Sequence, residues 1–229
     1  MLRKLNLSII FAFVLSLNMF SQTTSTTTSG STKFDINQFH GIVAEPKGSS
    51  VQGSQYYQEE FLDAHISVVN NQIVAVRYNV VNDEMEFERG GQVLQMYKTD
   101  SLTVSFLKIN KVFKVVEYDF KGQTNKGFLI ANTQNDKVNF FMKEVITYVP
   151  FKDALSSYTQ PVSAHYRKDK NAYFIEINNK ITEMPNKKKS LLKLFPNNVD
   201  AIEKFLKTYK TDFDSKSDLI TLTNFLNKL

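Results

Sequence analysis

The sequence contains no cysteine and no tryptophan, and it has only eight glycines and five prolines in 229 residues. The absence of cysteine excludes a disulfide framework, thiol catalysis and a lipid-carrying N-terminal cysteine. The chain also has no GxSxG elbow, Walker A loop, Rossmann glycine pattern or HExxH helix. The sequence therefore gives no motif for a serine hydrolase, a nucleotide-binding protein or a zinc protease.

Apolar and aromatic residues, by contrast, are abundant. They make up 42% and 13% of the chain, with 19 Phe and 10 Tyr, which is typical of a globular protein. A chain of this length buries enough surface to fold without disulfides. The formal net charge is +5, and two of the basic residues lie at the extreme N-terminus, so the charge does not indicate nucleic-acid binding.

The N-terminus predicts export. Arg3 and Lys4 precede an apolar run over Leu5–Leu17, which is the pattern of a secretory signal peptide, and we place it at residues 1–22. The run is shorter than the roughly 20 residues of a membrane span. No other segment reaches that length, so we expect no transmembrane span after cleavage. The expected location is the periplasm, the outer membrane surface or the exterior.

Residues 23–33 follow as a Thr/Ser-rich tract without an apolar side chain. Such a tract has nothing to bury, and we interpret it as a linker. A domain rich in β-strands is expected at residues 34–184.

The stretch Ile73–Met96 predicts three short antiparallel strands. Asn82-Asp83 and Gly90-Gly91 are residue pairs that favour two-residue hairpin turns. The register that follows pairs Val80 with Met85, Tyr78 with Phe87, Arg77 with Glu88, Phe87 with Leu94 and Met85 with Met96. One face of the sheet is then apolar. The other face is expected to be solvated and carries Arg77, Asn79, Glu84, Glu86, Glu88 and Gln95.

Further short apolar runs continue to Met184. In Val112–Tyr118, apolar residues stand at both odd and even positions. A bend is expected near Lys143-Glu144. We expect a mainly β (α+β) fold, built as an antiparallel meander sheet or a partly closed barrel. Phe151–Gln160 is interpreted as a connector.

After Pro185 the apolar period changes from two to 3.6, which predicts C-terminal helices packed on the sheet at residues 185–229. The stripe of the second helix is Val199, Ile202, Phe205, Leu206 and Tyr209. Ser215 to Asp218 resembles a capping box that opens a third helix, whose inward residues are Leu219, Leu222, Phe225, Leu226 and Leu229. A cap of this kind would cover the sheet.

Two segments carry a resemblance. RYNVVNDEMEF (77–87) and the tail at 191–226 resemble secreted proteins of unassigned function from Bacteroidota-type Gram-negative bacteria. The resemblance implies an envelope location. It implies no activity, ligand or site residue.

The remaining candidates for chemistry are few. His40, His65 and His165 have no metal-ligand spacing. The acids Glu59-Glu60 and Glu84/Glu86/Glu88 are interpreted as solvated. Lys187–Lys189 are interpreted as a solvated helical face rather than a site for anionic lipid. We therefore assign no catalytic residue, cofactor or metal ligand.

The leading hypothesis is a non-catalytic envelope protein that binds or scaffolds an envelope protein. This version predicts a filled core and an exposed apolar patch. The alternative is a carrier of an apolar or lipid-like ligand, which predicts a β cavity of at least ~300 Å³. A hydrolase would need convergent polar residues in a cleft, near His165 or the Glu84–Glu88 strand. The sequence leaves the oligomeric state open.

Overall fold

The computed structural model describes residues 39–42, 51–70, 72–156 and 158–229. The predicted signal peptide and linker lie outside the described residues.

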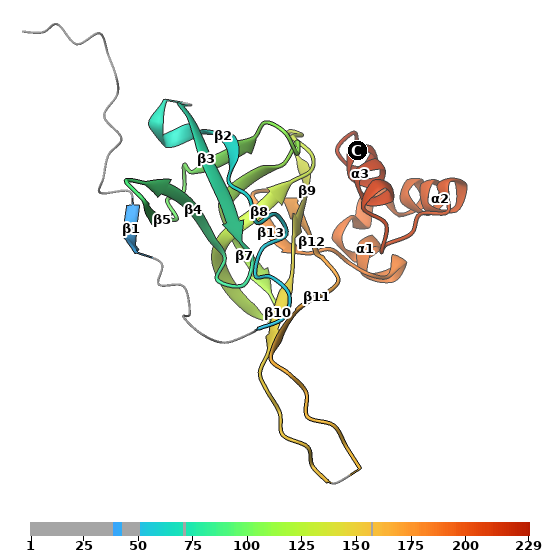
Figure 1. The fold of residues 1–229 in the computed structure, drawn as a ribbon. Coiled ribbons are helices and arrows are strands. Elements are labelled where there is room, and N and C mark those ends of the chain that lie inside the picture. Colours follow the sequence, from blue (N-terminus) through green and yellow to red (C-terminus); the bar gives the residue numbers. More distant parts are fainter. Residues whose placement is uncertain (1–38, 43–50, 71, 157) are drawn as a thin grey trace, which may run out of the picture. The chain divides into compact units, whose positions relative to one another are not determined.

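Thirteen strands are the main secondary structure of the described part of the chain (Figure 1). They are β1 (Phe39–Ile42), β2 (Leu62–Ile66), β3 (Gln72–Asn79), β4 (Glu84–Arg89), β5 (Gln92–Met96), β6 (Thr103–Phe106), β7 (Val112–Phe120), β8 (Gln123–Ala131), β9 (Val138–Lys143), β10 (Ile146–Val149), β11 (His165–Lys168), β12 (Ala172–Ile177) and β13 (Lys180–Glu183). Eleven form one antiparallel sheet in the order β1-β5-β4-β3-β2-β6-β7-β8-β9-β12-β13, and β10 pairs only with β11. The mainly β, antiparallel fold predicted from the sequence is confirmed.

From β2 onwards the sheet is a meander with two interruptions, while β1 pairs with β5 at one edge. After β5 the chain returns to the far side of β2, and between β9 and β12 it leaves the sheet through β10 and β11. The sheet also curls, because its edge strand β13 lies against the central strand β7. Beside this contact, the Lys121 N–H donates a hydrogen bond to the Glu183 carboxylate at 2.6 Å. The expected bend near Lys143-Glu144 is the break between β9 and β10.

Side chains pack on both faces of the central strands. Phe113 and Val115 of β7 belong to the main core with Phe87 and Phe128. Tyr118, on the other parity, belongs to a second cluster that also contains Leu129, Phe141, Phe174 and Ile181. The apolar residues on both parities of Val112–Tyr118 are explained by these two cores.

The second hairpin has the predicted register and the first does not. Gly90 and Gly91, with φ of 60° and 76°, join β4 to β5 so that Phe87 lies opposite Leu94. In the first hairpin, however, Tyr78 lies opposite Met85 and Arg77 opposite Glu86. The loop between these strands has four residues rather than two. The error is two positions, which leaves every side chain on its predicted face.

The C-terminal helices are α1 (Lys188–Leu194), α2 (Val199–Tyr209) and α3 (Lys216–Leu226), with short 3-10 turns at Ser67–Val69 and Pro196–Asn198. Ser215 is the N-cap of α3, and its hydroxyl accepts a bond from the Asp218 N–H, as predicted. The helices contribute Leu191, Ile202, Leu206, Leu219 and Leu222 to one buried cluster that also contains Phe140 and Ile175 of the sheet. Within it, α3 packs against β9.

None of the helices in the described part of the chain combines the length and the apolar character that a membrane span requires.

Candidate functional site: polar clusters on the sheet and a groove between helices

Glu86 occupies the centre of a buried polar cluster on the side of the sheet opposite the main core. It accepts a hydrogen bond from Arg77 Nε at 2.7 Å and one from Asn79 Nδ2 at 3.0 Å. The Tyr56 hydroxyl donates to the same carboxylate at 3.0 Å. Burial, and then the Glu86 carboxylate, raise the pKa of Tyr56 above its ordinary value, so the phenol remains a donor. Each carboxylate oxygen therefore has partners within the protein.

The prediction of a solvated face is wrong for Glu86 and Asn79, which are both completely buried. The segment before β2 covers them. Its Tyr56 ring lies 4.2 Å from the Arg77 guanidinium carbon, and Phe61 lies on the same group at 4.5 Å. Such stacking lets an arginine enter a dry site while its charge faces the carboxylate.

The other two acids of β4 have different surroundings. Glu88 is exposed, as predicted. Glu84 is half-buried and accepts a hydrogen bond from Gln95 at 2.5 Å. Burial raises the pKa of Glu84. The three glutamates therefore do not act as one acidic site.

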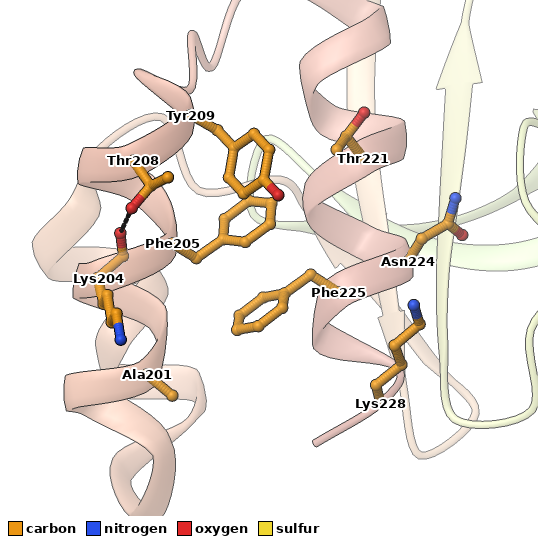
Figure 2. Close-up of a pocket in the computed structure, with 9 residues that line it drawn as sticks. All are labelled: Ala201, Lys204, Phe205, Thr208, Tyr209, Thr221, Asn224, Phe225 and Lys228. Carbon is orange, nitrogen blue, oxygen red and sulfur yellow. Dashed lines mark hydrogen bonds between the residues drawn. The ribbon is translucent and has the colours of Figure 1, made fainter.

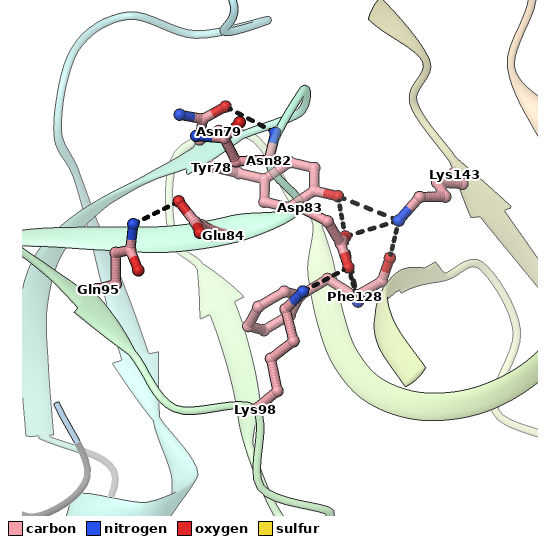
Figure 3. A network of polar contacts seen from close by, with 9 residues as sticks. All are labelled: Tyr78, Asn79, Asn82, Asp83, Glu84, Gln95, Lys98, Phe128 and Lys143. Atoms are coloured by element: carbon pink, nitrogen blue, oxygen red, sulfur yellow. Dashed lines mark hydrogen bonds and ion pairs between the residues drawn. The ribbon is translucent and has the colours of Figure 1, made fainter. Parts of the chain in front are cut away.

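A second cluster surrounds Asp83, whose backbone has a φ of 57° at the end of the first hairpin loop (Figure 3). Its carboxylate accepts bonds from the Tyr78 hydroxyl and Lys143 Nζ, each at 2.6 Å. Lys98 Nζ lies at 2.9 Å, and the Phe128 N–H donates at 3.3 Å. Asp83 thus connects the loop to β8, to β9 and to the segment after β5.

Gly127 makes this arrangement possible. A Cβ built on it would lie 2.0 Å from Asp83 Oδ2, so any other residue would displace the carboxylate. Together the two clusters engage Arg77, Tyr78, Asn79, Asp83 and Glu86 of the RYNVVNDEMEF segment. In this chain, these residues of the segment therefore have a structural role.

A hollow beside the main core is very small. It has a volume of about 20 Å³. Its lining includes Tyr57, Phe106 and the ion pair between Lys111 and Glu144. This is room for about one water molecule and far below the ~300 Å³ of a ligand pocket, so the hollow is too small for an apolar ligand.

The other sequence candidates lie apart. His65 is in β2 and His165 is in β11, while the side chain of His40 lies outside the described residues. Across the described ranges, no three His, Asp or Glu side chains are close enough to share a metal ion. Glu59, Glu60 and Lys187–Lys189 are exposed.

An open groove lies between α2 and α3 (Figure 2). Phe205 of α2 and Phe225 of α3 stack with their ring centroids 4.2 Å apart, at an angle of 14°. Tyr209 lies 4.5 Å from the Phe205 ring and remains 62% exposed. The groove has a volume of about 600 Å³, within the range of ligand-binding pockets.

The rim of the groove is polar and positive. Its remaining lining residues are Ala201, Lys204, Thr208, Thr221, Asn224 and Lys228. Two lysines and no acidic residue are among them, so a partner with an acidic group is electrostatically favoured. A hollow on the other side of α2 has about 640 Å³ but contains both signs of charge, including Asp200, Glu203 and Lys207.

The sequence did not predict this groove. Its periodicity placed Phe205, Tyr209 and Phe225 inward with the core stripe, yet Tyr209 is exposed and the two phenylalanines are half-buried. The feature of the sequence that could have indicated the groove is the width of the apolar stripe on these helices. Ile202 and Leu206 of α2 are buried in a cluster that also contains residues of α1 and α3, and this packing leaves the aromatic edge of the stripe open.

Comparison with known protein families, curated proteins and solved structures gives no significant match to this chain.

Proposed function

We propose that this protein is a non-catalytic, exported envelope protein that binds a protein partner through the groove between α2 and α3. The observation that carries the proposal is the stacked pair Phe205 and Phe225, beside an exposed Tyr209 and between two lysines. Aromatic rings on a rigid surface are the usual anchors of protein interfaces. The signal-like N-terminus and the resemblance to secreted Bacteroidota-type proteins support the proposed location.

The buried acids give less support to a hydrolase. A general acid or base must reach a substrate proton. Glu86 is wholly buried with three donors on its carboxylate, and Asp83 is held by two lysines. Both carboxylates serve the fold, since they join segments that are distant in the sequence.

The carrier alternative has less support from the sheet. An apolar ligand would need a cavity of ~300 Å³ or more, whereas the hollow beside the main core has about 20 Å³. Phenylalanine rings such as Phe87, Phe113 and Phe128 fill the space between the strands.

A photo-crosslinking residue in place of Thr208 tests the proposal. Thr208 is exposed and lines the groove, while Glu117 of β7 is exposed and does not. In cells of the source organism, irradiation should couple the chain to one protein from position 208 and not from 117. Adducts with lipid alone, or equal adducts from both positions, would contradict it.

A further inference from the structure

The chain between β10 and β11 forms an arm that projects beyond both strands (Figure 1). We define the arm as residues 150–156 and 158–163, all of which are exposed. Its two legs are joined by reciprocal backbone bonds between Lys152 and Val162, at 2.9 and 3.0 Å. The sequence interpretation of Phe151–Gln160 as a connector omitted this element.

The tip of the arm presents two large apolar side chains. Leu155 is 97% exposed and Tyr158 is 98% exposed, so neither is covered by its own chain. The backbone beside them is held by a turn, in which the Thr159 N–H donates to the Ser156 carbonyl at 3.1 Å. The Ser156 N–H also donates to the Thr159 hydroxyl at 3.1 Å.

The groove between α2 and α3 matches this tip in chemistry. Its stacked Phe205 and Phe225 offer an aromatic surface for a leucine and a tyrosine. Asp153 lies two residues before Leu155, and it would meet a rim whose charged residues are Lys204 and Lys228. The apolar surfaces are therefore complementary, and Asp153 adds a local opposite charge, although Lys152 beside it leaves the arm as a whole neutral.

We infer that the tip of one copy, Leu155 and Tyr158, docks in the α2–α3 groove of a second copy of this chain. The inference rests on the proposed function, because it names the occupant of the same groove. Tyr158 would stack on the exposed edge of the phenylalanine pair, with Leu155 beside it. The contact is heterologous, since a protruding element meets a groove of another copy.

The charge of the arm disfavours an anionic membrane as the binding surface. The arm has one lysine and one aspartate and no net charge, whereas anionic lipid surfaces attract basic segments. The contact is also small. A buried tyrosine contributes roughly 150–250 Å², so one tip and its groove fall below the ~1,200 Å² of stable complexes. The association is therefore expected to be weak and to increase with protein concentration.

Isotope-mixed photo-crosslinking tests the geometry. Chains carrying benzoylphenylalanine at position 158 are prepared with the ¹⁴N isotope and mixed with ¹⁵N chains that are otherwise unchanged. After irradiation, mass spectrometry should find adducts between the two labels, and they should map to α2 or α3. Adducts that map to any other element would overturn the inference.

Sedimentation velocity tests the energetics with matched variants. The mean mass should rise with concentration for the unchanged chain, and this rise should be lost in Leu155→Ser/Tyr158→Ser, whose exposed positions are not needed for folding. Thr208→Glu should raise the dissociation constant at least about ten-fold. Lys207→Gln makes the same change in charge on the same helix, outside the groove lining, and should have no such effect.

The two proposals fail in distinguishable ways. A chain that remains a monomer at every concentration, while position 208 couples to a different protein in cells, overturns the second-copy inference and leaves the proposed function. Binding to phosphatidylglycerol vesicles by the monomer, lost in the double variant at 155 and 158, also overturns the inference. A monomer without a protein adduct at position 208 overturns both.

Discussion

Glu86 and Glu88 lie two residues apart on β4, and both were predicted to face solvent. Glu86 is buried against Arg77, whereas Glu88 is exposed. Glu86→Gln removes the charge that the buried guanidinium faces, so it should lower the free energy of unfolding by about 3–5 kcal/mol. Glu88→Gln should change it by less than about 0.5 kcal/mol. Urea denaturation of the two variants measures the difference, and equal effects would disprove the buried pairing.

Gly127 and Asp83 should be energetically coupled. Because an added Cβ meets Asp83 Oδ2 at 2.0 Å, Gly127→Ala should lower the free energy of unfolding by about 1–3 kcal/mol, as overpacking does. In an Asp83→Ala background the obstructing carboxylate is gone, and the same change should have little effect. A double-mutant cycle in urea provides the measurement. Additive effects would show that the close approach is absent.

Tyr118 should make stability depend on alkaline pH. Burial, and then the nearby Asp83 carboxylate, raise its pKa from 10.0 to about 12. Above pH ~10 the phenol ionises in the unfolded chain but remains protonated in the folded one. The folded state then binds more protons, so the free energy of unfolding falls as the pH rises from about 10 towards 12. Tyr118→Phe should make this fall less steep, and an unchanged slope would contradict the assignment.

At the scale of elements, the hairpin β4–β5 follows from local sequence and the hairpin β3–β4 does not. Gly90-Gly91 supplies the positive φ that a two-residue turn needs, and nothing lies within 4 Å of a Cβ added to either glycine. The register of the first hairpin depends on Asp83, which is held by Phe128 and Lys143. These partners are 45 and 60 residues away, so the local pattern contained no information about them.

Gly91 allows the effect of backbone strain in the second turn to be measured without a side-chain clash. Its φ is 76° and an added side chain would meet no neighbour, so Gly91→Ala should lower the free energy of unfolding by about 1–2 kcal/mol through backbone strain alone. Gly91→Asn should lower it less, because asparagine tolerates this conformation. Thermal unfolding compares the two variants. Equal losses would mean that the strain does not arise from the left-handed backbone.

At the scale of the whole molecule, periodicity predicted the strand-rich part and the helical end, and the capping-box pattern predicted the helix cap at Ser215. It did not predict the surfaces that matter for the proposed function. An apolar stripe indicates which side chains avoid water, but how much of the stripe is covered depends on the elements that pack against it, as the exposed Tyr209 of α2 shows. In the same way, Leu155 and Tyr158 do not differ from core residues in the sequence, and only the fold leaves them exposed.

The most direct test of a protein-binding role is native mass spectrometry of the protein purified from cells of its source organism. We expect a complex of the chain with protein, either a second copy or another partner, and no bound lipid. This complex should be lost in Thr208→Glu and kept in Lys207→Gln. A single chain that carries a lipid, unaffected by either change, would rule out the protein-binding role.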